Sequence, residues 1–299
     1  MALVVALGAL TAPLVAQRQQ PTFRTGIQTV PVYATVTDEN GDLVKNLTRD
    51  DFMVFDDGKR QEVTVFSAGL QPITVVLLLD TSNSMTMNVP LMKQAAEQFL
   101  VRLLPGDHAR IGSFSDRITI SPRFTGDRDE LLRVVEDDIE IGNPTRLWDA
   151  IDQSMSATET QQGRRVTMVF TDGADTMSKK TWKDVARRGQ IEGLSVYVVS
   201  MRGNFRLVWD RPTSHVPPSE ELRRLAAETA GEYFAVTRED DLTHAMTRIA
   251  EDLHYQYALG FTPGMLDDQM HTLDVRVRVR GLTVRARTNY RAAEDRRGS

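Results

Sequence analysis

The chain has 299 residues, enough for one large domain and a smaller one, and its 41% hydrophobic content is ample for a packed core. Its 36 basic and 41 acidic residues give a formal net charge of -5, which excludes a general electrostatic attraction to nucleic acid. Cysteine is absent, so a disulfide framework, a thiol nucleophile and a lipidated cysteine are excluded as well.

The first predicted element is an apolar N-terminal segment. Residues 2 to 16 are apolar and end in small residues, and the polar run 17 to 20 follows. This pattern is typical of a secretion signal and is too short to span a bilayer, although no Lys or Arg precedes it. We therefore expect a signal segment over residues 1 to 20 and an exported protein, periplasmic or secreted, without a transmembrane anchor. A buried N-terminal strand or helix is the alternative.

Residues 21 to 70 have the pattern of an N-terminal β subdomain. Alternation predicts a strand over residues 29 to 37, with one face formed by Val30, Val32, Ala34 and Val36. A turn at residues 38 to 41 follows it. Residues 52 to 55 and 62 to 66 are predicted to form a hairpin around a turn at 56 to 58.

From residue 71 to residue 254, strands alternate with amphipathic helices. Strands are predicted at 73–79, 109–114, 117–121, 165–171, 194–200 and 232–236. Helices are predicted at 90–104, 127–137, 146–160, 179–190, 218–229 and 239–253. Such alternation predicts an α/β fold, a doubly wound and mostly parallel sheet of the Rossmann-like kind with helices on both faces.

Three segments of this unit carry oxygen-bearing side chains where a strand ends or a helix begins. They contribute Asp80, Ser82 and Ser84 from the first segment, Thr145 from the second and Asp172 from the third. Ligands of open α/β sheets bind at the carboxyl ends of the strands, so we expect these side chains to meet there. Magnesium prefers octahedral oxygen coordination with one or two carboxylates, whereas zinc is disfavoured without His or Cys ligands. The pattern therefore predicts a magnesium site with residual positive charge that attracts an anionic group.

The tail returns to β structure. Strands are predicted at 255–261, 273–280 and 282–290, with a turn at Gly281, and residues 293 to 299 are expected to be a disordered tail. Because the segments before and after the α/β unit are both β-rich, we expect residues 255 to 292 to pair with the N-terminal strands. The two together would form a small sandwich-like subdomain beside the α/β unit.

The oxygen-bearing segments also carry a family resemblance. Asp80-Thr-Ser-Asn-Ser84, Thr145 and Thr171-Asp-Gly173, in this order, resemble the metal-ion-dependent adhesion site (MIDAS) of von Willebrand factor type A (VWA) domains, over about residues 72 to 258. The resemblance implies a divalent ion, usually Mg²⁺ with Mn²⁺ or Ca²⁺ as alternatives, held by Asp80, Ser82, Ser84 and Thr145, and by Asp172 through water. It also implies an open coordination position that an Asp or Glu of a partner protein fills. Residues 50–58 and 257–263 further resemble a bacterial subfamily of VWFA-related envelope proteins.

Other polar residues are interpreted as structural. The histidines are scattered, with no metalloprotease spacing, and His244 and His254 are expected to be partly exposed on the last helix. Asp116 and Asp175 are interpreted as turn residues near the rim of the site. Met85 and Met87 are either core residues or apolar contacts around the ion.

The alternating arginines of the tail are interpreted as solvated residues that protect an edge strand, not as a surface for nucleic acid or anionic lipid. They are Arg276, Arg278, Arg280, Arg285 and Arg287.

These patterns favour a non-enzymatic, metal-dependent protein-binding module of the bacterial cell envelope, used in adhesion or as a scaffold. A magnesium-dependent hydrolase is the alternative, because haloacid dehalogenase phosphatases also keep an aspartate at the end of an apolar strand. Ser82 stands where those enzymes place the second carboxylate, so the general acid and base is missing. A metal-independent structural component of an envelope assembly is a further alternative.

Overall fold

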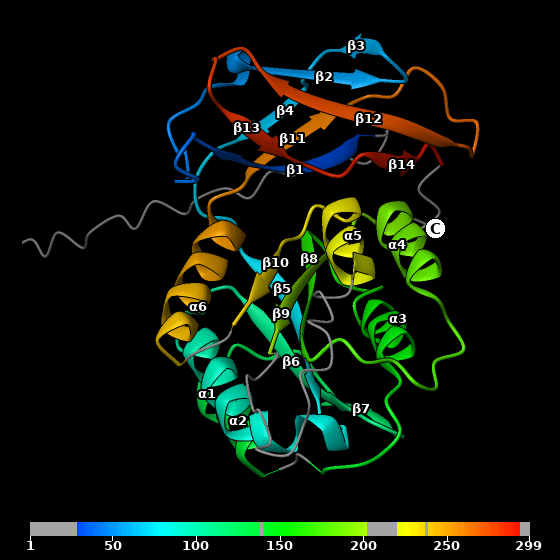
Figure 1. The fold of residues 1–299 in the computed structure, drawn as a ribbon. Helices are drawn as coiled ribbons and strands as arrows, with labels where there is room; N and C mark the ends of the chain where they lie inside the picture. Colours follow the sequence, from blue (N-terminus) through cyan, green and yellow to red (C-terminus); the bar gives the residue numbers. More distant parts are fainter. Residues whose placement is uncertain (1–28, 138–139, 202–219, 237–238, 294–299) are drawn as a thin grey trace, which may run out of the picture.

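The computed structural model describes residues 29–137, 140–201, 220–236 and 239–293, which form two stacked units (Figure 1). The predicted signal segment and the tail beyond residue 293 lie outside the described residues. No helix in the described part of the chain is both long and apolar enough to cross a membrane. The residue boundaries proposed between the units stay a prediction.

The larger unit contains a six-stranded sheet in the order β10-β9-β8-β5-β6-β7. Its strands are β5 (Ile73–Asp80), β6 (His108–Phe114), β7 (Ile118–Ile120), β8 (Arg164–Thr171), β9 (Ser195–Ser200) and β10 (Tyr233–Ala235). All neighbours are parallel except β7, which runs antiparallel to β6. Every residue of β5 and β8 is buried, as expected for strands covered on both faces.

Helices cover both faces of this sheet (Figure 1). On one face, α1 (Val89–Leu100), α2 (Arg128–Asp137) and α6 (Glu239–His254) share a hydrophobic core with the sheet. On the other, α3 (Leu147–Ala157), α4 (Trp182–Glu192) and α5 (Glu220–Glu228) form a second core. A short 3-10 helix, η2 (Asn83–Asn88), lies between β5 and α1. The doubly wound α/β fold is thus confirmed.

The smaller unit is a β sandwich built from both ends of the chain. One sheet has the order β13-β1-β11-β4 and the other β14-β12-β2-β3. The bounds are β1 (Val30–Thr37), β2 (Phe52–Asp56), β3 (Lys59–Gln61), β4 (Val65–Ser67), β11 (Tyr257–Phe261), β12 (Met270–Val277), β13 (Thr283–Arg285) and β14 (Asn289–Arg291), with a 3-10 helix, η1 (Arg49–Asp51), before β2. β1 pairs antiparallel with β11, with Val30 opposite Phe261. Inward side chains of both sheets share one core, which confirms the sandwich expected from N- and C-terminal strands.

The hairpin predicted between residues 52–55 and 62–66 is wrong in its second strand. β2 pairs with Lys59–Gln61, because Asp57 (φ 46°) and Gly58 (φ 76°) form a two-residue turn that returns the chain at once. The chain then crosses to the opposite sheet, where Val65–Ser67 pairs with β11. Alternation shows that residues 62–66 are extended, but does not identify their partner.

The strand predicted at 282–290 is also wrong, because it is divided between the two sheets. Thr283–Arg285 pairs with β1, whereas Asn289–Arg291 pairs with β12. Arg276, Arg278 and Arg280 are exposed, as expected. The edge-strand part of the prediction is wrong, because β12 lies between β14 and β2 and ends at Val277, before Arg278 and Arg280.

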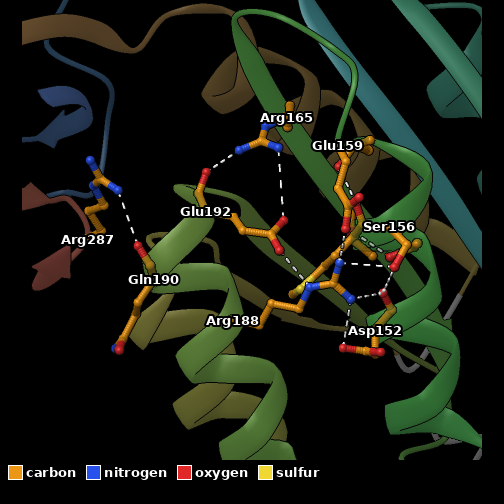
Figure 2. A network of polar contacts seen from close by, with 12 residues as sticks. Asp152, Ser156, Glu159, Arg165, Arg188, Gln190, Glu192 and Arg287 are labelled. Atoms are coloured by element: carbon orange, nitrogen blue, oxygen red, sulfur yellow. Dashed lines mark hydrogen bonds and ion pairs between the residues drawn. The ribbon is translucent and has the colours of Figure 1, made fainter. Parts of the chain in front are cut away.

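Arg285 and Arg287 join the sandwich to the α/β unit, and the expectation that they are solvated is wrong. Arg285 Nη2 donates to Asp252 Oδ2 of α6 at 2.6 Å, and Tyr197 OH donates to the same oxygen at 2.5 Å. Arg287 Nη1 donates to the carbonyl of Gln190 in α4 at 3.3 Å (Figure 2). Burial acts to raise the pKa of Asp252, but the charge of Arg285 and the hydrogen bond from Tyr197 outweigh it and hold that pKa below its ordinary value.

A contact within the α/β unit holds the end of α6, and it corrects the expectation for His254. This side chain is buried, and its Nε2 lies 2.7 Å from Asp107 Oδ2. Asp107 Oδ1 in turn accepts a hydrogen bond from the backbone N–H of Ile73, the first residue of β5. His244 is exposed, as expected.

Candidate metal centre

The centre of the candidate site is Asp80, the last residue of β5. Its Oδ2 accepts a hydrogen bond from Thr171 Oγ1 at 2.6 Å, and its Oδ1 accepts one from the Ser82 N–H at 3.0 Å. Thr171 ends β8, the neighbouring strand, so the carboxyl ends of two parallel strands converge on this carboxylate.

Burial dominates the electrostatics of Asp80. It raises the pKa of this fully buried carboxyl to about 6, against the opposing hydrogen bonds from Ser82 and Thr171. The charge of Asp172 raises the pKa of Asp80 further, so Asp172 lies near enough to repel it. A cation between them would relieve both the burial cost and the repulsion.

Two hydroxyls follow Asp80 in the first loop. Ser82 Oγ and Ser84 Oγ lie 3.1 Å apart. Ser82 is buried, whereas Ser84 is exposed on η2. One residue of the pair therefore lies in the protein interior and the other at the surface. Met85 is completely buried and is therefore a core residue, whereas Met87 is 64% exposed.

The second loop, which carries Thr145, is tied to the first by backbone contacts. Ser82 and Gly142 form an isolated parallel β-bridge, and the Gly142 N–H donates to the Thr81 carbonyl at 3.0 Å. Thr145 itself is buried, two residues before the start of α3. The loop therefore brings a hydroxyl-bearing residue to the same edge of the sheet.

The third loop, which follows Asp172, is tied to the second. The Thr145 carbonyl accepts hydrogen bonds from the N–H groups of Thr176 and Met177, both at 3.0 Å. The Thr145 N–H donates to Thr176 Oγ1 at 2.9 Å. Asp172 is half-buried, and its Oδ1 accepts from the Ala174 N–H at 2.9 Å. The three loops thus form one connected structure, while metal binding by the five side chains remains a prediction.

Two residues that support these loops, Thr171 and Thr176, were not among the predicted site residues, although Thr171 belongs to the quoted motif. Thr171 holds Asp80, and Thr176 holds the Thr145 backbone. Both are hydroxyls within four residues of Asp172, and that proximity is a signal the sequence carries. Asp175 accepts from the Leu147 N–H at 2.8 Å at the start of α3, a capping role in keeping with its interpretation as a turn residue.

The helix that begins after Thr145 is held in place by a charged network (Figure 2). Arg188 of α4 forms ion pairs with Asp152 at 2.9 Å, Glu159 at 2.6 Å and Glu192 at 2.7 Å. Asp152 lies on α3 and Glu159 just beyond it, so one guanidinium links α3 to α4. The network supports the position of Thr145 at the N-terminus of α3.

The donor atoms fit a hard divalent cation. Carboxylates and hydroxyls are the oxygen ligands that Mg²⁺, Mn²⁺ and Ca²⁺ prefer, and a buried Asp80 beside a second carboxylate favours a cation. Asp80, Ser82, Ser84 and Thr145 would hold such an ion, with Asp172 close by.

A separate acidic cluster lies in the sandwich. Asp56, Asp57 and His271 offer possible metal-ligand atoms within 4.8 Å of one another. Both ring nitrogens of His271 face carboxylates, Nδ1 at 2.8 Å from Asp56 and Nε2 at 3.1 Å from Asp267. Burial acts to lower the pKa of His271, but these carboxylates outweigh it and raise that pKa above its ordinary value. This arrangement suits a protonated imidazole paired with carboxylates.

Comparison with known families gives a match over residues 74–248 to the model of the von Willebrand factor type A domain. Among solved structures, a von Willebrand factor type A protein from Catenulispora acidiphila has a TM-score of 0.50 at 13% identity, and the match covers 91% of this chain and 76% of that one. Proximal thread matrix protein 1 from the mussel byssus, solved with zinc in its MIDAS motif, has a TM-score of 0.52 at 15% identity, covering 66% of this chain and 49% of that one. An aerotolerance-related membrane protein from Bacteroides fragilis has a TM-score of 0.49 at 18% identity, covering 60% and 98%. Comparison with curated protein sequences gives no match.

Proposed function

Because the chain belongs to the von Willebrand factor type A (VWA) domain family, we propose that it is a metal-dependent protein-binding module, an adhesion or scaffold component of the bacterial cell envelope. Asp80, Ser82, Ser84 and Thr145 hold a divalent ion, with Asp172 acting through water. The ion supplies a positive charge with an open coordination position. An Asp or Glu side chain of a partner protein occupies that position.

One observation carries this proposal. Asp80 is fully buried where three interlocked loops meet, and the largest influences on its pKa are burial, hydrogen bonds and the charge of Asp172. No Lys or Arg of the described chain is among those influences. A buried carboxylate that lacks a cationic partner is costly, so the site favours a cation from solution.

The same geometry supports binding over hydrolysis. A phosphatase of the kind considered from the sequence needs a second carboxylate two residues after the first, but Ser82 occupies that position. The residues therefore favour ligation of a partner as the role of the ion.

We further propose export to the periplasm or beyond, on the basis of the apolar segment at residues 1 to 20 and the resemblance of residues 50–58 and 257–263 to envelope proteins. A reporter fused after residue 28 tests this, because export requires the segment to direct the reporter out of the cytoplasm. Retention of the reporter in the cytoplasm would contradict the proposal.

The metal proposal is tested by thermal unfolding of the purified chain in chelator and then with Mg²⁺, Mn²⁺, Ca²⁺ or Zn²⁺. Zn²⁺ is included because the mussel thread protein was solved with zinc in its MIDAS motif. A hundredfold excess of ion over Kd should stabilise the protein by about 2.7 kcal/mol. Asp80→Asn should abolish this response. An equal response in the variant would place the ion elsewhere, and turnover of phosphoesters by the metal-loaded protein would favour the hydrolase.

A further inference from the structure

Large apolar side chains are exposed on each of the three loops of the candidate metal centre. Met87 is 64% exposed, Ile141 52% and Met177 62%. Met87 belongs to the first loop, Ile141 to the second and Met177 to the third. We call these three residues the apolar rim.

The backbone of the apolar rim is held by the contacts that hold the metal loops. Ile141 precedes Gly142, which forms the bridge to Ser82. The N–H of Met177 donates to the Thr145 carbonyl at 3.0 Å. Met87 follows Ser84 by three positions in η2, which is anchored by the buried Met85. Each rim residue is thus positioned together with a proposed metal ligand.

Single exposed apolar residues are ordinary on protein surfaces, but their distribution here is not scattered. In the described part of the chain, nine large apolar side chains are exposed, and three of them are the rim residues. A further three, Met265, Leu266 and Met270, lie at the β11–β12 connection of the sandwich. The apolar rim therefore combines one exposed apolar residue from every metal loop with a polar centre.

Two lysines near Met177 add positive charge at this edge. Lys179 and Lys180 are exposed two and three residues after Met177, and their N–H groups both donate to Asp149 Oδ1 at 3.0 Å. A metal ion and two ammonium groups favour an anionic ligand, while apolar neighbours around it exclude water and strengthen the ion–carboxylate contact. Methionine adapts to branched and aromatic side chains alike.

We propose that the site selects a partner segment in which an Asp or Glu is flanked by large apolar residues. The carboxylate reaches the ion, and the flanking side chains pack against Met87, Ile141 and Met177. This inference rests on the proposed function, because it needs the ion to be bound. It adds the chemistry of the residues around the acid, which the metal ligands alone do not determine.

Three synthetic peptide pools test the inference with the full chain in Mg²⁺. The first has a central Asp with flanks randomised over Leu, Ile, Val, Met and Phe. The second has the same Asp with flanks of Ser, Asn, Gln and Gly, and the third has a central Asn with the apolar flanks. We expect the first pool to bind about tenfold more tightly than the second, and the third to bind no better in Mg²⁺ than in chelator.

Matched variants separate the rim from the ion. The triple variant Met87→Ser, Ile141→Ser, Met177→Ser should bind the first two pools equally and keep the wild-type stabilisation by Mg²⁺. The control variant Met265→Ser, Leu266→Ser, which alters exposed apolar residues of the sandwich, should keep the preference for apolar flanks.

The outcomes distinguish the two proposals. Equal binding of the first two pools by the wild type, or a preference that survives the triple substitution, would overturn the apolar inference and leave the metal-dependent proposal standing. No difference between Asp and Asn pools would overturn the proposed function itself. A dimer that dissociates in the triple variant, with no peptide preference in the wild type, would assign the rim to contact with a second copy and also overturn the inference.

Discussion

Ser82 and Gly142 lie opposite each other in a parallel β-bridge that joins the first and second loops of the metal centre. No side chain larger than a hydrogen atom fits at Gly142 without displacing its neighbours. A Cβ atom added to Gly142 would lie 2.3 Å from Asp116 Oδ1 and 2.4 Å from Ser115 Oγ. The bridge that positions Ser82 and Thr145 therefore depends on glycine.

Gly142→Ala should displace the second loop. We expect a loss of about 1–3 kcal/mol in stability, because the added methyl group forces the side chains of residues 115 and 116 to move. The stabilisation by Mg²⁺ should also fall, since Thr145 shifts with the loop. Thermal unfolding with and without Mg²⁺ measures both effects. Gly264→Ala is the control, because its added methyl group meets no atom within 4 Å.

Asp80→Asn should make stability in chelator less dependent on pH. The folded-state pKa of Asp80, about 6, lies above its ordinary value of 3.8, so the folded protein retains this proton as the unfolded chain loses it. Stability is therefore lost as pH rises from about 4 to about 6, by about 3 kcal/mol in total. Denaturant unfolding across this range should show the loss in the wild type and in Asp116→Asn, but not in Asp80→Asn.

The stabilisation of the wild type by Mg²⁺ should have the opposite pH dependence. The ion competes with the proton on Asp80, so stabilisation by Mg²⁺ should increase as pH rises through about 6. Titration with Mg²⁺ at several pH values measures the apparent affinity. An affinity independent of pH would contradict the assignment of Asp80 as a ligand.

Arg285→Met should destabilise the junction between the two units. The substitution leaves Asp252, whose side chain is 3% exposed, without its cationic partner, and we expect a loss of about 3 kcal/mol. Arg276→Met is the matched control, because its ion pair with Asp274 lies on the surface and should contribute less than about 1 kcal/mol. Denaturant unfolding measures both, and equal losses would contradict a special role for Arg285.

His271→Asn should remove a contribution to stability that depends on pH. Because Asp56 and Asp267 raise the folded-state pKa of His271, the contribution is complete below the unfolded value of 6.5 and is lost as pH rises through the higher folded value. The difference between wild type and variant should therefore shrink as pH rises above 6.5. His244→Asn, at an exposed position on α6, is the control substitution.

The sequence was sufficient for features that depend on local patterns. The apolar runs of β5 and β8 predict buried parallel strands, and each is followed by the oxygen-bearing side chains of the candidate site. The β strands around them could be recognised as extended, but their partners could not. Val65–Ser67 alternates in the same way whether it pairs with β2 or, as observed, with β11.

Charged residues with distant partners were also beyond sequence reasoning. Arg285 lies next to Val284 in an alternating strand, and only the folded chain brings it to Asp252 and Glu232. His254 is on a helix whose pattern allows exposure, but Asp107, 147 residues earlier, lies against it. Such pairs depend on how distant segments pack in the folded chain, which periodicity does not report.

Because β1 pairs with β11, the sandwich can form only late in translation. A ribosome makes β1 to β4 first, yet four of the eight sandwich strands, β11 to β14, emerge only after the whole α/β unit. Until β11 to β14 are made, the early strands therefore have unpaired edges, and such edges make a nascent chain prone to aggregation. The α/β unit has all of its strands by then, so it is free to fold first and to bring the two halves of the sandwich together.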